Sequence, residues 1–307
     1  MAKHRLFYLI CISNKYFFNL HIMKEAKNRA SELILLGAGP GDPELITVKA
    51  WRILQKATVI LYDNLANTAL LDLAPPGCEK IYVGKLPYTA IGEACIQQTI
   101  HELIREKARK GGTIIRLKGG DPFIFGRGFE EILFARQLGM TITYVPGITS
   151  MQAAGLSDIP LTHRNVSESI WMITGTKKDG SLSGDLQLAM RSAATVVIYM
   201  GMKKLEEIAG LYRQQGLEDI PAAIIQHASL PHQKMARGKV GLLPELAKEH
   251  SLTNPAIIII GEVVNVTDYR QSPLYLERRE GSPVACTLSP WIPGPQTANS
   301  WPTRAII

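Results

Sequence analysis

The sequence predicts an α/β protein made of two α/β halves. Apolar runs of about five residues alternate along the chain with amphipathic stretches, and the runs show no regular polar alternation. Such continuous runs are typical of strands that helices cover on both faces. Turns rich in glycine, aspartate and proline follow several of these runs. In open α/β sheets the ligand binds beside the ends of the strands, so these turns are the first candidates for a functional site.

The first half is expected over residues 31–146. Its strands are predicted at 33–37, 58–62, 80–84, 113–117 and 141–145, and its helices at about 45–56, 96–110 and 128–138. Gly111 and Gly112 follow the second helix and form a common helix stop. The dipeptide Pro146-Gly147 interrupts the pattern and is the predicted boundary between the halves.

The second half is expected over residues 147–270. It starts with a helix near 150–156, and strands are predicted at 169–174, 195–200, 221–226 and 255–264. Residues 1–30 are expected to be an extension outside the fold, with Met23 as the start of the functional chain. Residues 271–307 are polar, rich in proline and without periodicity, which predicts a disordered tail.

Composition narrows the class of partner. The chain has 307 residues and a net charge of +7, which favours an anionic small molecule. Nucleic acid is a weaker candidate, because no basic stripe is interleaved with aromatic residues. The apolar run Leu6–Ile12 has seven residues, whereas a membrane span needs about 20. A cytoplasmic protein with no membrane partner is therefore expected.

Cysteine and histidine spacing argues against disulfides and metals. The four cysteines form no C-x-x-C pair, which suits reduced thiols in a cytoplasmic protein. His227 and His232 are the closest histidine pair, and a proline lies between them. A metal site is not expected.

Four strand-end turns carry glycine or charge. They are Gly37–Gly41, Asp63, Lys85 and Gly119–Asp121, and a doubly wound sheet brings such turns to one edge. The first turn, GAGPGD, departs from a dinucleotide-binding loop, because Pro40 lacks an N–H group and Asp42 would repel a phosphate. The residues predict a ligand-binding cleft lined by backbone, with acidic and basic groups beside it. They leave the reaction open.

The segment RLKGGDPFIFGRG, together with GAGPGDPELIT, LYDNL, YVGK, VPGITS, IPLTHR and YMG, resembles the uroporphyrinogen-III C-methyltransferases of the tetrapyrrole methylase family. The resemblance covers about residues 33–265. It implies two α/β domains with a methyl-donor cleft between them. It also implies that S-adenosylmethionine methylates two carbons of uroporphyrinogen III to give precorrin-2, for sirohaem or cobalamin synthesis, in a homodimer.

The resemblance also implies roles for individual residues. Asp63 and Lys85 are the expected acid/base pair. The expected donor contacts are Pro40, Gly119, Gly120, Asp121, Ile124, Thr149, Ser150, Met200 and Ala228, the last of which is a glycine in the family. Arg127 and Arg164 are candidates for substrate carboxylates, because a guanidinium matches a carboxylate in two-point geometry. Salt bridges that serve only the structure are the alternative for both arginines.

Several positions depart from the family pattern. Asn64 and Leu86 replace common arginines, and Gln226-His227-Ala228 replaces an acid-Asn-Gly triplet. These departures leave two alternatives open. One is a methylase of the same family that acts on another tetrapyrrole. The other is a binding protein of this fold without catalytic activity.

Overall fold

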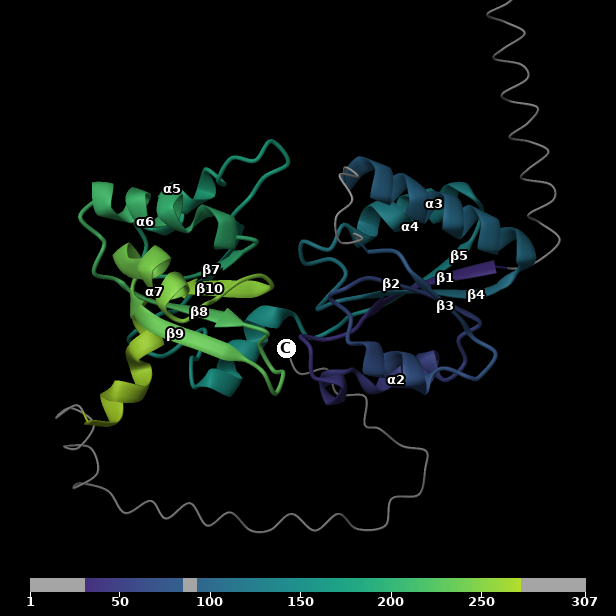
Figure 1. Cartoon of the computed structure of the whole chain (residues 1–307), viewed down its shortest axis with the longest axis horizontal. Helices are drawn as coiled ribbons and strands as arrows, with labels where there is room; N and C mark the ends of the chain where they lie inside the picture. Colours follow the sequence, from purple (N-terminus) through teal and green to yellow (C-terminus); the bar gives the residue numbers. More distant parts are fainter. Residues whose placement is uncertain (1–30, 85–92, 272–307) are drawn as a thin grey trace, which may run out of the picture. The chain divides into compact units, whose positions relative to one another are not determined.

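The computed structural model describes residues 31–84 and 93–271 (Figure 1). The predicted N-terminal extension and the predicted tail beyond residue 271 lie outside the described residues. Lys85 and Leu86 lie outside them as well.

The first half of the described chain contains a five-stranded parallel sheet in the order β3-β2-β4-β1-β5. Its strands are β1 (Ser31–Gly37), β2 (Val59–Tyr62), β3 (Glu79–Tyr82), β4 (Gly112–Lys118) and β5 (Thr141–Val145). Because the strands are parallel and β4 lies between β1 and β2, the turns that follow these three strands meet at one edge. This is the arrangement that the sequence predicted.

Helices cover both faces of this sheet. The helices α3 (Glu93–Lys110) and α4 (Gly128–Gln137) lie on one face, and α2 (Val48–Leu54) lies on the other with the 3-10 helix η2 (Thr68–Leu73) (Figure 1). Strand residues alternate between two buried clusters, since successive side chains point to opposite faces. Leu33, Leu61 and Ile114 pack toward α3 and α4. Ile34, Ile60 and Ile115 pack toward α2 and η2.

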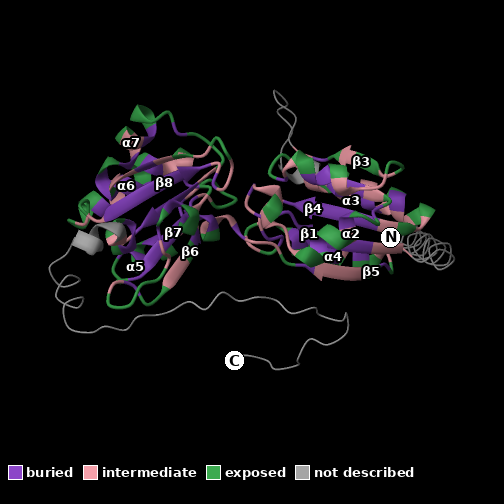
Figure 2. Cartoon of the chain, turned by 90° about the horizontal axis from the view of Figure 1, so that it is seen from below, coloured by how far each residue is buried: buried purple, intermediate pink, exposed green. Residues whose placement is uncertain are grey.

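The central strands explain the long apolar runs. In β1 the last five residues are buried, and in β4 the last five are buried (Figure 2). Two of the five in β4 are the cations Arg116 and Lys118. A buried strand that carries two cations requires anions nearby, and these define the candidate site.

The second sheet has the order β6-β7-β10-β8-β9, and its only parallel pair among the described strands is β6–β7. Its strands are β6 (Ile170–Thr174), β7 (Thr195–Tyr199), β8 (Pro221–Gln226), β9 (Lys234–Lys239) and β10 (Ala256–Ile260). Its helices are α5 (Asp185–Ala189), α6 (Leu205–Gln214) and α7 (Leu243–Glu249). Besides η2, the described residues form the 3-10 helices η1 (Pro43–Leu45), η3 (Ser150–Ser157), η4 (Met202–Lys204), η5 (Val240–Leu242) and η6 (Glu262–Gln271).

The α/β class is confirmed, and several details differ from the sequence prediction. Strand β9 was not predicted, because its sequence KMARGK is that of an edge strand with a polar exposed side. The segment predicted as a helix near 150–156 is the 3-10 helix η3, and the strand predicted at 255–264 ends at Ile260. The exact domain boundaries remain predictions.

Candidate active site

Asp63 directly follows β2, and its carboxylate is held in two ways. One oxygen, Oδ1, accepts a hydrogen bond from the backbone N–H of Leu65 at 3.1 Å, which closes a tight turn. The other, Oδ2, accepts a hydrogen bond from Nη2 of Arg116 at 2.9 Å. The Asp63 side chain retains 19% of its exposure, whereas Arg116 retains 2%. Asp63 is thus the solvent-accessible end of a buried ion pair.

Period-two alternation places both members of the pair on one face. Leu61 is paired with Arg116 in the register of β2 and β4. Asp63 lies two residues beyond Leu61, so it points to the same face, which is the face covered by α3 and α4. Nη1 of Arg116 also donates to the carbonyl oxygens of Leu117 at 2.8 Å and Leu61 at 3.4 Å. The backbone of two neighbouring strands therefore fixes the guanidinium plane.

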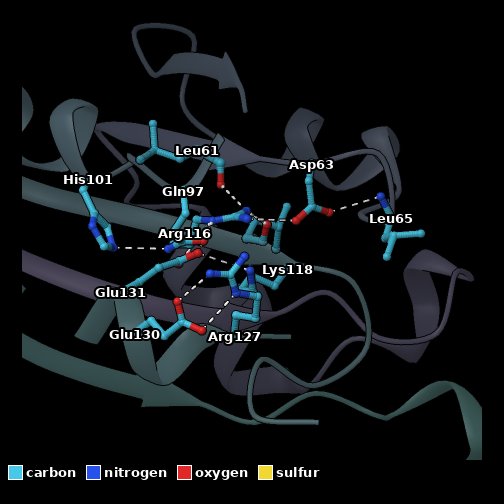
Figure 3. Close-up of polar contacts among 11 residues, drawn as sticks. Leu61, Asp63, Leu65, Gln97, His101, Arg116, Lys118, Arg127, Glu130 and Glu131 are labelled. Atoms are coloured by element: carbon cyan, nitrogen blue, oxygen red, sulfur yellow. Dashed lines mark hydrogen bonds and ion pairs between the residues drawn. The ribbon is translucent and has the colours of Figure 1, made fainter. Parts of the chain in front are cut away.

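A second ion pair continues the network into α4 (Figure 3). Glu131 is 1% exposed, and its carboxylate lies 3.3 Å from Nε of Arg116 and 3.3 Å from Nζ of Lys118. Burial lowers the pKa of Lys118, as does the neighbouring charge of Arg116, and Glu131 opposes both effects. The four side chains carry two positive and two negative charges, so the buried network is neutral as a whole.

The glycine turns pack against one another beside this network. Gly39 and Gly120 form a bridge in which the Gly120 N–H donates to the Gly39 carbonyl at 2.7 Å. A methyl group on Gly37 would lie 2.5 Å from the Cα atom of Gly147, and one on Gly119 would lie 2.6 Å from Cβ of Leu65. Close approach within the chain thus accounts for the missing side chains at 37 and 119. Gly120 has φ +62°. A methyl group on it would lie at least 3.8 Å from every described residue other than its chain neighbours.

Asp121 is 8% exposed and is engaged by the protein itself. Its Oδ1 accepts from the backbone N–H of Phe123 at 2.8 Å. Its Oδ2 accepts from the hydroxyl of Tyr144 at 2.7 Å and from the N–H of Gly147 at 3.1 Å. The pKa of Tyr144 is raised by burial and by this carboxylate. Asp121 thereby ties the turn after β4 to the turn after β5.

Thr149 and Ser150 lie at the start of η3. The hydroxyl of Thr149 lies 2.7 Å from the hydroxyl of Tyr199, which also accepts from the N–H of Met151 at 3.1 Å. Tyr199 is the last residue of β7 and immediately precedes Met200. One phenol therefore joins two turns that sequence analysis assigned to the donor.

Several residues in these turns have a left-handed backbone although they are not glycine. The φ angles are 54° at Phe125, 57° at Arg127, 55° at Met200, 51° at His227 and 72° at Ser229. Non-glycine residues seldom adopt this region, and such strain concentrates at functional sites. Arg127 and Met200 are predicted site residues. His227 and Ser229 flank Ala228, which is another predicted site residue. Met200 is 49% exposed.

The segment around Ala228 lies against the first glycine turn. The N–H of Asp42 donates to Oγ of Ser229 at 2.9 Å, and a methyl group on Gly41 would lie 3.1 Å from the carbonyl oxygen of Ala228. Gln226, which stands where the family has an acidic residue, has a hydrogen-bond partner in this structure. Its side-chain amide exchanges two hydrogen bonds with Thr253, at 2.9 and 3.0 Å.

The remaining predicted site residues are Arg127, Arg164, Pro40, Ile124 and Lys85. Arg127 forms a two-point ion pair with Glu130, at 2.6 and 2.9 Å, in the first turn of α4. Arg164 is exposed and lines a separate pocket of about 690 Å³ with Thr162, His163, Asn165, Ser167 and Glu168. Pro40 adjoins the Gly39–Gly120 bridge, and Ile124 is half-buried. Lys85 lies outside the described residues.

No group of three His, Cys, Asp or Glu side chains in the described ranges is placed to hold a metal ion. The rings of His227 and His232 lie 4.5 Å apart, centroid to centroid. In the same ranges, none of the helices has the length and apolar character needed to cross a bilayer.

Comparison with known proteins decides the family. Residues 32–244 match the family model described as Tetrapyrrole (Corrin/Porphyrin) Methylases. The chain belongs to the tetrapyrrole methylase family. This tetrapyrrole methylase is 39% identical over 240 residues to a uroporphyrinogen-III C-methyltransferase of Methanocaldococcus jannaschii, a match that covers 77% of this chain and 98% of the relative. It is 42% identical over 251 residues to a siroheme synthase of Chromobacterium violaceum, which covers 80% of this chain and 53% of the relative. The chain thus spans about half the length of that relative.

Solved structures give the same family. A native uroporphyrin-III C-methyltransferase from Thermus thermophilus is 38% identical, with a TM-score of 0.66, and the match covers 77% of this chain and 100% of that one. A structure of the Thermus thermophilus methyltransferase in complex with S-adenyl homocysteine gives the same values. These comparisons confirm the resemblance that the motifs indicated.

Sequence analysis missed the partners of the predicted residues. It left Arg116 and Lys118 without a role and did not single out Glu131, Tyr144 or Tyr199. A signal for the first three existed. Two cations at alternate positions of an apolar strand share one buried face, and such a face requires a buried anion from the covering helix.

Proposed function

We propose that this tetrapyrrole methylase transfers methyl groups from S-adenosylmethionine to two ring carbons of uroporphyrinogen III, giving precorrin-2. The observation that carries the proposal is the position of Asp63. Its partly exposed carboxylate is oriented by buried Arg116, and Leu65 of the same turn packs on Gly119. An oriented anion thus lies beside the glycine turn expected to contact the donor.

The chemistry requires such an anion. S-adenosylmethionine, when bound, supplies an electrophilic methyl group. A carbon–sulfur bond breaks, a carbon–carbon bond forms at the pyrrole, and the ring then loses a proton. Asp63 stabilises the positive charge on the ring and accepts that proton. Lys85 is proposed as its acid partner.

The turns suit a donor that has no phosphate. Pro40 offers no N–H group, and the turn after β4 carries the Asp121 carboxylate, which would repel a phosphate. Two exposed apolar side chains lie in these turns: Met200 is 49% exposed, and Phe125 is 40% exposed with its ring centroid 5.1 Å from that of Tyr199. We assign the donor to Pro40, Gly119, Gly120, Asp121, Ile124, Thr149, Ser150, Met200 and Ala228. Gly120 has open space on the side where a side chain would project.

The substrate is a polyanion with eight carboxylates, and the net charge of +7 favours its approach. Arg127 and Arg164 remain candidates for carboxylate contacts. Arg127 would have to exchange its pair with Glu130 for a substrate carboxylate. Because that pair is exposed, the exchange costs little. Asn64 is neutral where the family commonly has arginine, so less of the substrate binding depends on that turn.

The test is an assay with S-adenosylmethionine and uroporphyrinogen III under anaerobic conditions, with products followed by mass spectrometry. Two added methyl groups per tetrapyrrole are expected. If the protein binds S-adenosylhomocysteine by calorimetry yet yields no methylated uroporphyrinogen, the substrate assignment is wrong. Activity on another tetrapyrrole would then favour the first alternative, and inactivity on all of them would favour a binding protein.

We also infer that the enzyme acts in the cytoplasm as a homodimer on a small-molecule substrate, with no metal, nucleic acid or membrane partner. The inference rests on the family resemblance and on the absence of a basic stripe in the sequence. Sedimentation equilibrium of the full chain tests the dimer. A monomer at micromolar concentration would refute it.

A further inference from the structure

The network behind Asp63 contains two charged side chains beyond the Asp63–Arg116 ion pair. Arg116 alone would neutralise Asp63. The structure adds Glu131 and Lys118, which are 1% and 9% exposed; Glu131 pairs with both Lys118 and Arg116. Two further buried charges are costly unless they are well paired, so their presence at this position calls for a function.

We propose that Glu131 and Lys118 are positioning residues, and that together they hold Arg116 on Asp63 and set the electrostatic field at the Asp63 carboxylate. The inference deepens the proposed function, since it rests on Asp63 as the proton acceptor. Neither residue contacts the solvent-accessible end of the network, so neither is placed to touch substrate.

The geometry supports the positioning role. The guanidinium has donors on three edges, and each edge has its own partner. Nη2 faces Asp63 at 2.9 Å, Nη1 faces the Leu117 carbonyl at 2.8 Å, and Nε faces Glu131 at 3.3 Å. Without Glu131, the Nε edge would be buried and unpaired. Rotation of the guanidinium would then compete with its bond to Asp63.

The charge balance supports the electrostatic role. From β4, Arg116 and Lys118 face Glu131, and Asp63 approaches from the turn after β2 (Figure 3). The charge of Asp63 also acts on Lys118. Removal of either member of the Lys118–Glu131 pair therefore changes the net charge beside Asp63 by one unit.

Further titratable groups near the network lie on α3 and at the start of α4. His101 of α3 lies within electrostatic reach of Glu131, Glu130, Arg105 and Arg127. Glu130 and Arg127 compensate each other through their exposed ion pair. The pKa of His101 is lowered by its burial, which keeps the ring neutral at neutral pH. These groups therefore add little net charge to the network.

The two single variants are expected to act in opposite directions. Glu131→Gln leaves an uncompensated cation, which stabilises the Asp63 carboxylate. The acidic limb of the pH–rate profile should then move to a pH about one unit lower. Lys118→Met leaves an uncompensated anion and should move the limb up by about the same amount. A purely structural role predicts lower stability in both variants and no opposite movement.

The double variant Lys118→Met/Glu131→Gln restores neutrality. It should fold even if a single variant does not, since replacement of a whole buried pair is often tolerated. Its acidic limb should return to within a few tenths of the wild-type position, while kcat falls about tenfold because a neutral amide oxygen holds Nε of Arg116 less strongly than the carboxylate does. A double variant with both the wild-type limb and the wild-type kcat would overturn the positioning role.

The experiment measures kcat from pH 3.5 to 9 for uroporphyrinogen III with S-adenosylmethionine, using the full chain. Glu207→Gln is the control, because it removes one exposed negative charge that pairs with Lys204 at the start of α6, and it should leave the limb unchanged. Folded single variants whose limbs do not move, or move in the same direction, overturn the proposal. If the wild-type protein does not methylate uroporphyrinogen, the proposed function fails. The inference is then judged by the titration midpoint of the Asp63 carboxyl in carbon-13 NMR, which should shift in the same opposite directions.

Discussion

Arg116 and Asp63 form the only ion pair in the described chain that joins β4 to the turn after β2, with 2.9 Å between Nη2 and Oδ2. The arginine is fully buried and the carboxylate is accessible. The pair therefore orients a reactive group from beneath without covering it. An enzyme that relies on positioning benefits from an acid whose orientation is fixed in this way.

Replacement of Asp63 by Asn should abolish most turnover while donor binding persists. The amide oxygen still accepts from Leu65, so the turn is kept, but the proton acceptor is lost. We expect kcat to fall by about 100-fold or more. Calorimetry with S-adenosylhomocysteine should give an affinity within about twofold of the wild-type value.

The control for this variant is Asp72→Asn. Asp72 is an exposed carboxylate in η2 of the same half of the chain. The Asp72→Asn variant should keep full activity. Equal activity of Asp63→Asn and Asp72→Asn would remove Asp63 from the mechanism.

Tyr199→Phe should weaken donor binding without unfolding the protein. The variant loses the hydroxyl that joins Thr149 and Met151 but keeps the ring, whose centroid lies 5.1 Å from that of Phe125. A net loss of about 1 kcal/mol corresponds to about fivefold weaker binding of S-adenosylhomocysteine. Titration calorimetry measures the change.

Tyr212→Phe provides the matched control. Its hydroxyl is buried in α6 and, among the described residues, has no hydrogen-bond partner. Removal of this hydroxyl should leave donor affinity unchanged and stability equal or higher. If both variants bind the donor like the wild-type protein, Tyr199 does not organise the site.

Gly37→Ala tests the packing of the strand-end turns. A methyl group there would lie 2.5 Å from Gly147 and 2.8 Å from the carbonyl oxygen of Gly120, and all of these contacts are with backbone. Since backbone cannot rotate away, we expect destabilisation of about 1–3 kcal/mol in urea unfolding. Gly210→Ala in α6, where no atom lies within 4 Å of the added methyl, should instead stabilise by about 0.5–1 kcal/mol. Equal effects of the two substitutions would show that Gly37 is not tightly packed.

Apolar runs predicted most strands because both sheets bury their central strands. In β10 the run of isoleucines coincides with the buried part of the strand, whereas the buried part of β4 also contains Arg116 and Lys118. Strand β9 escaped prediction because only one edge of it is paired, so its sequence did not need to be apolar. Its assignment depends on the neighbouring β8, which a local pattern does not contain.

The candidate site was predictable as a set of turns but not as a network. Asp63 and Gly119–Asp121 were located because they follow strands, and parallel strands bring their ends together. The anion that compensates Arg116 comes from α4, where Glu131 has the same local sequence character as exposed Glu130. Only helix packing decides which of the two is buried. The glycine turns were predicted to let a ligand approach the backbone, and at 37 and 119 the structure adds close contacts within the chain.

His101 should make stability depend on pH in the mildly acidic range. Its ring stacks on Phe134 with centroids 4.2 Å apart and planes within 3°. Burial lowers its pKa from the ordinary value of 6.5, despite the opposing charges of Glu131 and Glu130. The unfolded chain therefore binds the proton first as the pH falls below about 6.5. The contribution of His101 is present in full above that value and is lost as the pH falls through the folded-state pKa.

His101→Gln should remove this part of the pH dependence. The glutamine does not titrate, so the difference in melting temperature between pH 7.5 and pH 5 should be smaller in the variant than in the wild-type protein. Differential scanning calorimetry across this range measures it. His250→Gln, which changes a histidine at the end of α7 in the other half of the chain, is the control and should retain the wild-type slope. An unchanged slope in His101→Gln would mean that other groups govern acid sensitivity. A reduced slope assigns it to the imidazole packed between α3 and α4, beside the network that holds Asp63.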